Sequence, residues 1–318
     1  MAMVETRAGF PVGDWTSDVR KRLLAGLPVT DRRLEVASVT TAVLEGGDGP
    51  PLVLLPAPGE FAAVWIRVLP DLVATHHVIA PDLPGSGASE VPGGSPRLDT
   101  VLSWLGELVS QTCPTPPVLV GHTAGGALAA RFAVDHGERL ERLVLVDSYG
   151  LARFRPAPKM ALSFIRATLR PTERSVDRAF RHCFVDLNGV RAEMGERWEL
   201  LAAYALDRFR TPSVKAAGRS LGPKLVSAIP PDDLARIAAP TTLIWGRHDL
   251  GVRLEVAEAA SARFGWRLHV IENAADDPAI EQPEAFLRAL RASLGSPSRS
   301  LEERSGRSEP PHGRATLP

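Results

Sequence analysis

The sequence predicts an α/β protein with a mostly parallel sheet that is covered by helices on both faces. Short unbroken apolar runs at residues 52–55 and 143–146 are typical of strands that are buried on both sides. These runs alternate with stretches of helical spacing, such as residues 98–113. Strands that alternate with helices of this length favour a parallel sheet, because each parallel crossover needs a helix-length connection.

The expected elements follow one another along most of the chain. A stretch rich in Val and Thr at 34–44 predicts one or two strands, and the turn cluster GGDGP follows it at 46–50. Further strands are expected at 52–55, 77–80, 118–120, 143–146, 242–245 and 268–271, and helices at 65–74, 98–113, 124–136, 252–264 and 283–294.

One stretch breaks this alternation. Residues 151–233 contain several helical segments and no clear strand, which predicts a helical cap inserted between core segments 34–150 and 234–294. Residues 1–33 contain one modest helical stretch and are expected to form a loosely attached lead-in. Residues 295–318 are rich in Ser, Arg, Pro and Gly, and we expect a disordered tail because this composition cannot offset the entropy of ordering.

Composition limits the expected partners and location. The 37 Lys and Arg residues balance the 37 Asp and Glu residues, so the net charge predicts binding neither to nucleic acid nor to a membrane. The two cysteines, Cys113 and Cys183, are too few for a disulfide framework, and no signal peptide is recognisable, so a cytoplasmic location is expected. No metal-ligand spacing or nucleotide-binding motif occurs, so we expect no cofactor and no metal.

A glycine-rich turn, VLVGHTAGG at 118–126, joins a strand directly to a helix. Small residues suit this place because the turn is tight and the helix packs closely on the strand. With APDLPGSGAS at 80–89, WGRHD at 245–249 and EQPEAF at 281–286, the chain resembles the α/β-hydrolase superfamily over about residues 34–294. The resemblance implies an α/β-hydrolase fold with a helical cap, and a hydrolase for a small organic molecule such as an ester.

The resemblance also implies a catalytic Ser, His and acid, of which only the acid, Asp249, is present. The nucleophile position is Thr123, whose hydroxyl is either a slow nucleophile, a hydrogen-bonding group or a pocket-lining remnant. Aligned on Pro278, the histidine position is Asp276, and a carboxylate is a far weaker base than imidazole at neutral pH. Two close carboxylates would serve as an acid and a base, attract a cation, or be solvated or capping groups.

The expected oxyanion site is altered as well. Of the two N–H donors that the resemblance implies, one belongs to Ala124. The other falls on Pro58, which has no N–H, or on Gly59 if the alignment shifts by one residue. His122, beside the elbow, is expected to point away from the nucleophile. Among the remaining histidines, His182 in the cap is the candidate that could reach it.

We expect a small apolar or ester-like molecule to bind between the cap and the core, where the cap contributes several aromatic side chains. Six cap arginines form either a solvated face or a site for a carboxylate-bearing ligand: Arg155, Arg166, Arg170, Arg174, Arg178 and Arg181.

These residues leave three functions open. The first is a divergent hydrolase in which Thr123, Asp249 and Asp276 support weak or non-serine chemistry. The second is a non-catalytic pseudo-hydrolase that binds a small molecule. The third is an active ester hydrolase whose base comes from elsewhere, such as His182.

Overall fold

The protein is described by a computed structural model over residues 12–57, 61–93 and 95–295. Pro58, Gly59 and almost all of the expected tail lie outside these residues. The strands are β1 Thr30–Val36, β2 Val39–Gly46, β3 Pro51–Leu55, β4 His77–Pro81, β5 Val118–His122, β6 Arg142–Val146, β7 Thr241–Gly246 and β8 Arg267–Ile271.

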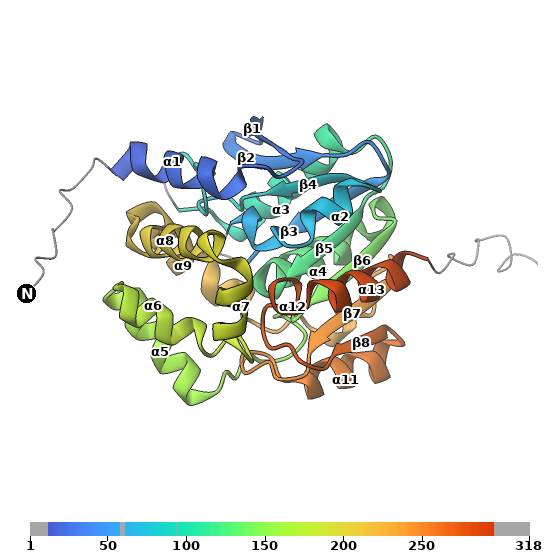
Figure 1. Ribbon diagram of the computed structural model, residues 1–318. Coiled ribbons are helices and arrows are strands. Elements are labelled where there is room, and N and C mark those ends of the chain that lie inside the picture. The colour runs from blue at the N-terminus through green and yellow to red at the C-terminus, as the bar shows by residue number, and fades with distance from the viewer. Residues whose placement is uncertain (1–11, 58–60, 94, 296–318) are drawn as a thin grey trace, which may run out of the picture.

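The strands form one eight-stranded sheet in the order β1-β2-β4-β3-β5-β6-β7-β8 (Figure 1). β1 and β2 form an antiparallel hairpin, and β2 pairs antiparallel with β4. From β4 to β8 every neighbouring pair is parallel. The predicted mostly parallel sheet is therefore confirmed, and the stretch expected to hold one or two strands holds the β1–β2 hairpin.

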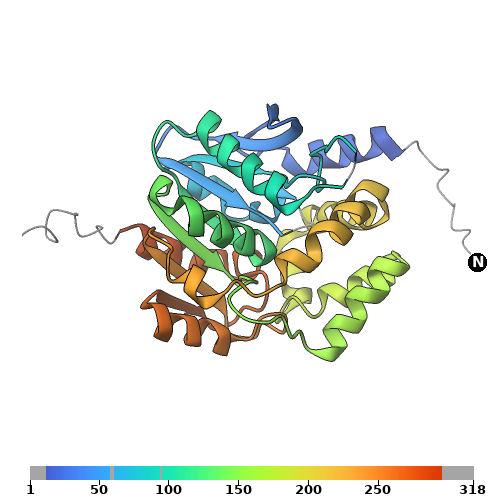
Figure 2. The same cartoon turned by 180° about the vertical axis from the view of Figure 1, so that it is seen from behind.

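Helices cover both faces of the sheet (Figures 1 and 2). The core helices are α2 Leu69–Val73, α3 Leu98–Thr112, α4 Thr123–His136, α11 Leu254–Phe264, α12 Pro278–Glu281 and α13 Pro283–Leu294, with short 3-10 helices η1 Ala62–Trp65 and η2 Gly137–Arg139. Among the helices of the described residues, none combines the length and apolar character that a bilayer crossing requires.

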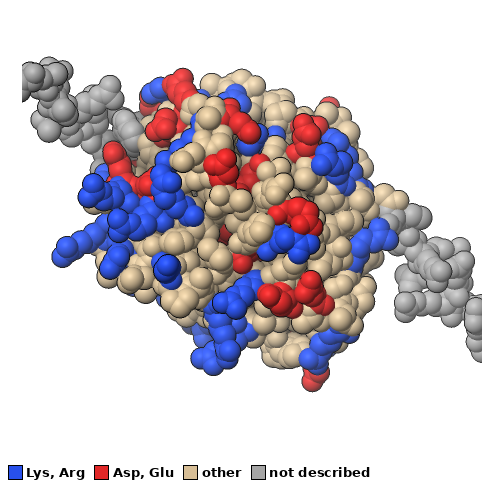
Figure 3. Space-filling view, turned by 60° about the horizontal axis from the view of Figure 1, so that its bottom comes forward, with Lys and Arg blue, Asp and Glu red and all other residues tan. Residues whose placement is uncertain are grey.

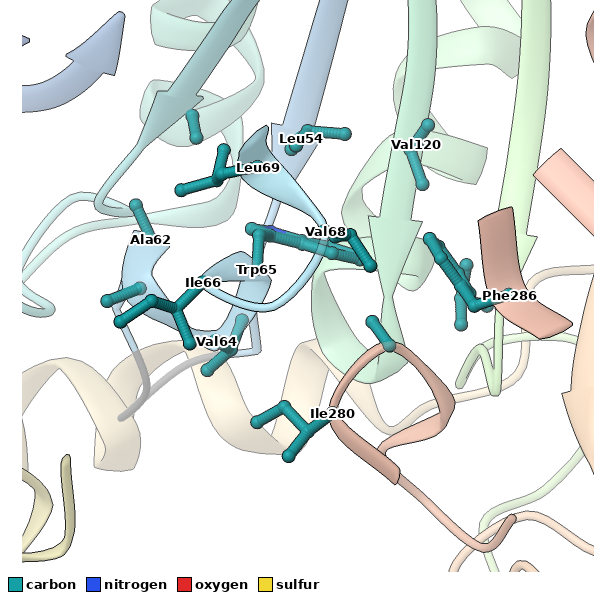
Figure 4. Packing of buried hydrophobic residues seen from close by; sticks show 14 of the residues in the cluster. Leu54, Ala62, Val64, Trp65, Ile66, Val68, Leu69, Val120, Ile280 and Phe286 are labelled. Atoms are coloured by element: carbon teal, nitrogen blue, oxygen red, sulfur yellow. The ribbon is translucent and has the colours of Figure 1, made fainter. Parts of the chain in front are cut away.

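Alternate strand residues supply two separate hydrophobic cores. Leu54 of β3 packs in one core with Trp65 and Phe286, on the face covered by η1 and α13 (Figure 4). Its neighbour Val53 belongs to the other core, together with Leu128 of α4. This division follows from the strand geometry, because successive side chains point to opposite faces of the sheet.

Six helices lie between β6 and β7, in the stretch that was expected to form a cap. They are α5 Pro158–Leu169, α6 Glu173–Phe180, α7 Leu187–Met194, α8 Glu196–Arg210, α9 Pro212–Leu225 and α10 Pro231–Leu234. Figures 1 and 2 show α5, α6, α8 and α9 gathered at one side of the sheet.

The sequence predicted a loosely attached lead-in at residues 1–33, and this prediction is wrong for the described part, residues 12–33. Its helix α1, Val12–Leu24, packs against α8 of the cap region, and Val19 and Leu23 are buried in the core. The segment also contributes β1, which begins at Thr30 rather than after residue 33. The correction arises because the helix is held by residues that are distant in the sequence.

A buried ion pair makes the attachment of α1 specific. Arg20 Nη1 donates to Asp82 Oδ2 at 2.7 Å, and the same guanidinium bonds to Asp31. Asp82 is fully buried and also accepts hydrogen bonds from the backbone N–H groups of Ala62 and Ala88. Removing one partner of such a pair is costly, because the other charge remains buried without compensation.

We expect Arg20→Ala to lower the free energy of unfolding by about 3 to 5 kcal/mol, measured by urea denaturation. Arg22→Ala is the matched control, because Arg22 pairs with Glu196 on the exposed side of the same helix and its loss costs about 1 kcal/mol or less. Equal losses in the two variants would contradict the role of the buried pair.

Candidate active site

Four candidate site residues follow four neighbouring parallel strands. Thr123 follows β5, Asp147 follows β6, Asp249 lies in the turn after β7, and Asp276 lies in the loop after β8. Neighbouring parallel strands end at the same edge of the sheet, which is where open α/β sheets bind ligands. The fold therefore gathers one hydroxyl and three carboxyl groups from distant parts of the sequence.

The elbow at Thr123 depends on close contact between β5 and α4. A Cβ atom on Gly121 would lie 2.6 Å from the Cα of Gly126, and one on Gly125 would lie 2.4 Å from the carbonyl oxygen of Pro56. Thr123 itself has φ of 47°, a left-handed conformation that costs a β-branched residue roughly 1 to 3 kcal/mol. The backbone is therefore strained at the residue that carries the hydroxyl.

The hydroxyl of Thr123 is buried and has no hydrogen-bond partner among the described residues. Ala124, the expected oxyanion donor, follows it in the first turn of α4, where backbone N–H groups have no partner within the helix. The other expected donor position, at Pro58 or Gly59, lies outside the described residues. No described residue accepts a hydrogen bond from the hydroxyl of Thr123.

Asp249 is oriented by its own turn. Its Oδ1 accepts the N–H of Gly251 at 2.6 Å, and its Oδ2 accepts the N–H of Val252 at 3.1 Å. Burial raises the pKa of Asp249 well above its ordinary value, and the neighbouring charge of Asp276 raises it further. The pair therefore favours a state in which one of the two carboxyl groups holds a proton.

Asp276 occupies a buried place beside the cap. It is 6% exposed, and its backbone N–H donates to the carbonyl oxygen of Cys183 at 3.1 Å. One ligand atom each from Cys183, Asp276 and Asp277 lie within 4.8 Å of one another, which is close enough to surround a cation. Asp249 and Asp276 are not solvated groups, because both are buried. The other alternative, a capping group, fits Asp249, which accepts the N–H groups of its own turn.

Asp147 is a site residue that the sequence analysis missed. It is fully buried, has φ of 43°, and its Oδ1 accepts the N–H of Gly246 at 2.9 Å. Burial raises its pKa well above the ordinary value, and the charges of Asp249 and Asp276 add to this rise, whereas His122 opposes it. The available signal was an acidic residue directly after a short apolar run, VLVDS at 144–148.

The two candidate imidazoles are both engaged elsewhere. The Nε2 atom of His122 lies 2.6 Å from the carbonyl oxygen of Asp276, and the ring packs edge-on against Trp65. The Nε2 atom of His182 lies 3.1 Å from the hydroxyl oxygen of Ser163, within the cap. No hydrogen bond joins either ring to Thr123 in the described part of the chain.

Glu281 connects the cap to the loop that carries Asp276. Its Oε1 accepts the N–H of Ala275 at 2.5 Å, and its Oε2 accepts the N–H of Val185 at 2.6 Å. Burial is the main reason that the pKa of Glu281 rises from 4.5 to about 7. This carboxyl group therefore changes its charge near neutral pH.

A cleft of about 640 Å³ opens between the cap and the turn after β7. His182, Phe184 and Val185 line it from the cap, and Asp249 and Leu250 line it from the core. Thr123 is not part of its lining. The cleft therefore leads to the acid of the site but not to the hydroxyl.

Comparisons with known proteins agree with this architecture. A family model described as alpha/beta hydrolase fold matches residues 50–283. The pimeloyl-[acyl-carrier protein] methyl ester esterase of Aeromonas hydrophila subsp. hydrophila is 27% identical over 271 residues, which cover 81% of this chain and 100% of that protein.

Two solved structures share the fold. Carboxylesterase CesB from Bacillus subtilis superposes with a TM-score of 0.76 at 19% identity, over 89% of this chain and 98% of that chain. The 2-hydroxy-6-oxo-6-phenylhexa-2,4-dienoate hydrolase of Rhodococcus sp. strain RHA1 superposes with a TM-score of 0.74 at 22% identity, over 84% of this chain and 99% of that chain.

The sheet, the strained elbow after β5 and the inserted helices define a protein of the hydrolase architecture. The chain belongs to the alpha/beta hydrolase fold family. The resemblance and the fold class expected from the sequence are thus confirmed, and the relatives include esterases and other hydrolases.

The raised pKa of Glu281 predicts a loss of stability as the pH rises from about 4.5 to about 7. In this window the folded protein retains a proton that the unfolded chain releases, so folding becomes less favourable by about 3 kcal/mol. We expect Glu281→Gln to remove this pH dependence, so that the stability of the variant relative to the wild type increases by about 2 to 3 kcal/mol between pH 5 and pH 8.

The measurement is urea denaturation at several pH values. Glu284→Gln, on the exposed side of α13, is the control for the same substitution at a surface position. A difference between Glu281→Gln and the wild type that does not change with pH would show that Glu281 keeps an ordinary pKa.

Proposed function

We propose that this chain is a divergent α/β-hydrolase that binds a small organic molecule, such as an ester, and that hydrolysis through Thr123 is weak or absent. The observation that carries the proposal is that the Thr123 hydroxyl has no hydrogen-bonded base among the described residues. A general base must lie within about 2.6 to 3.2 Å of the oxygen whose proton it takes, directly or through one water.

The residue at the histidine position supports the same proposal. Asp276 stands there, beside Asp249, which in the family would orient an imidazole. A carboxylate at its ordinary pKa takes a hydroxyl proton poorly, and a carboxyl group that is already protonated cannot take it at all. Loss of the triad base in a working enzyme lowers kcat by about four to six orders of magnitude.

A second candidate function has its own support. Asp249 and Asp276 form a buried carboxyl pair in which the pKa of Asp249 is raised. Such a pair holds a proton at neutral pH and can donate it to a bound molecule, while the ionised partner accepts one. This is the non-serine chemistry that the pair would perform on a ligand in the adjoining cleft.

The class of ligand follows from two lines of support. The cleft beside Asp249 carries both polar and apolar side chains and has the size typical of small-molecule sites. The Aeromonas relative is named as an esterase for a methyl ester, which favours an ester-like molecule here. We also propose a cytoplasmic location, which the low cysteine content supports.

Restoring the family pattern tests the proposal. We expect the wild type to hydrolyse p-nitrophenyl butyrate little faster than buffer, and the double variant Thr123→Ser with Asp276→His to gain about 100-fold or more. Each single variant should gain little, because members of a triad act as a unit. Adding Asp249→Asn to the double variant should abolish most of the gain, and circular dichroism confirms that each variant is folded.

The opposite result would identify an ordinary hydrolase. Rapid turnover by the wild type that is lost in both Thr123→Ala and His182→Ala would show that the cap supplies the base. Ligand binding without turnover, unchanged in Thr123→Ala and Asp276→Asn, would instead identify a pseudo-hydrolase.

A further inference from the structure

The charges of the chain balance in number but not in position. Residues 153–181, which include α5 and α6, contain eight Lys or Arg residues and only two acidic ones, Glu173 and Asp177. All eight basic side chains are exposed. In Figure 3, Lys and Arg gather at the left of the molecule, on the side where the cap helices lie.

The acidic residues do little to neutralise this surface. Asp177 is bonded to Arg181 and Arg191, so one acid is shared by two arginines. Five other basic side chains form no ion pair with any described residue: Lys159, Arg166, Arg170, Arg174 and Arg178. The α5–α6 pair therefore presents a local positive field that the zero net charge of the chain conceals.

Helix α5 also carries an apolar stripe that faces away from the protein. Leu162, Ile165 and Leu169 are 47%, 55% and 74% exposed. At 3.6 residues per turn they lie on the side opposite the buried residues Met160 and Ala167. A helix that is apolar on two opposite sides uses one side for its own protein and leaves the other uncovered.

The basic side chains flank this stripe. Lys159, Arg166 and Arg170 share one side of α5, next to the stripe rather than opposite it. The long aliphatic parts of Lys and Arg can lie along an apolar surface while their charged ends reach toward anionic groups. An exposed aliphatic stripe bordered by basic residues is the pattern of helices that lie in the headgroup region of a membrane.

Helix α5 begins next to a turn that lines the cleft. The N–H of Ala157, just before α5, donates to the carbonyl oxygen of Leu250 at 2.9 Å. Leu250 and Val185 are 40% and 49% exposed, and both line the cleft that contains Asp249. The start of α5 is therefore held to the turn that lines the cleft, while the stripe lies further along the helix.

We propose that the α5–α6 pair docks this protein on an anionic lipid surface, with Leu162, Ile165 and Leu169 inserted and the flanking Lys and Arg on the headgroups. A second copy of the chain is a poorer occupant, because a two-fold interface would bring the basic side chains of two copies together. An acidic protein is also a poorer occupant, because the stripe is aliphatic and lacks the Trp and Tyr side chains that anchor protein interfaces.

Vesicle sedimentation with the full chain tests the proposal. We expect binding to vesicles of phosphatidylcholine with phosphatidylglycerol, little binding to phosphatidylcholine alone, and release at high salt. The charge reversal Arg166→Glu, Arg170→Glu, Arg174→Glu should weaken binding about tenfold or more. The stripe variant Leu162→Gln, Ile165→Gln, Leu169→Gln should weaken it by a similar factor.

The matched control makes the same change of charge on the surface of the α/β part of the protein, outside α5 and α6. Arg236→Glu, Arg263→Glu, Arg288→Glu alters exposed arginines near or within α10, α11 and α13 and should bind vesicles much as the wild type does. All of the substituted residues are exposed, and circular dichroism verifies that each variant is folded.

Three results would overturn the proposal. One is that the wild type does not bind the anionic vesicles. This holds also if the chain binds an acidic protein instead. Another is equal binding by the control, charge-reversal and stripe variants. The third is a wild-type dimer in light scattering that the stripe variant converts to a monomer without any vesicle binding.

Discussion

The parallel pairing of β5, β6, β7 and β8 is the constraint on which the candidate site depends. In this register His122 lies opposite Val146, Val146 opposite Ile244, and Gly246 opposite Ile271. The four strands therefore end together, and the residues that follow them meet at one edge. Thr123 and three aspartates come to the same edge of the sheet for this reason, although the chain between them includes the whole cap.

The carboxylates that meet at this edge repel one another, and the surrounding hydrogen bonds offset this repulsion only in part. Backbone N–H groups of Gly246, Gly251 and Val252 point at the carboxylates of Asp147 and Asp249. These donors stabilise negative charge, but burial and mutual repulsion still raise the pKa of both groups. The charge of Asp276 contributes to the raised pKa of both groups. Our proposal that hydrolysis through Thr123 is weak or absent rests on this cluster of carboxyl groups together with the Thr123 hydroxyl, which has no hydrogen-bond partner among the described residues.

The inserted helices combine two features that are otherwise separate in the molecule. On the inside, the N–H of Val185 and the carbonyl of Cys183 bond to the loop that carries Asp276 and Glu281. On the outside, α5 and α6 carry the exposed apolar stripe and four exposed Lys or Arg side chains. The inserted helices therefore contribute both to the candidate site and to the surface that we propose to dock on lipid.

The sequence by itself determined the order of helices and strands and the elbow at Thr123, because these are written in local patterns. Short apolar runs mark buried strands, small residues mark the tight turn, and the order of motifs marks the position of Asp276. Even the strain at Thr123 follows from its place in that turn.

Only the tertiary structure decided how α1 is held, that Asp147 joins the site, and that Glu281 bridges to Val185. Each of these depends on groups far apart in the chain whose distance no local pattern encodes. The position of charge is a mixed case. The sequence already shows eight basic residues within 153–181, and the fold decided that all eight side chains are exposed. Burial and exposure depend on which surfaces meet in space, so they are fixed only when the chain folds.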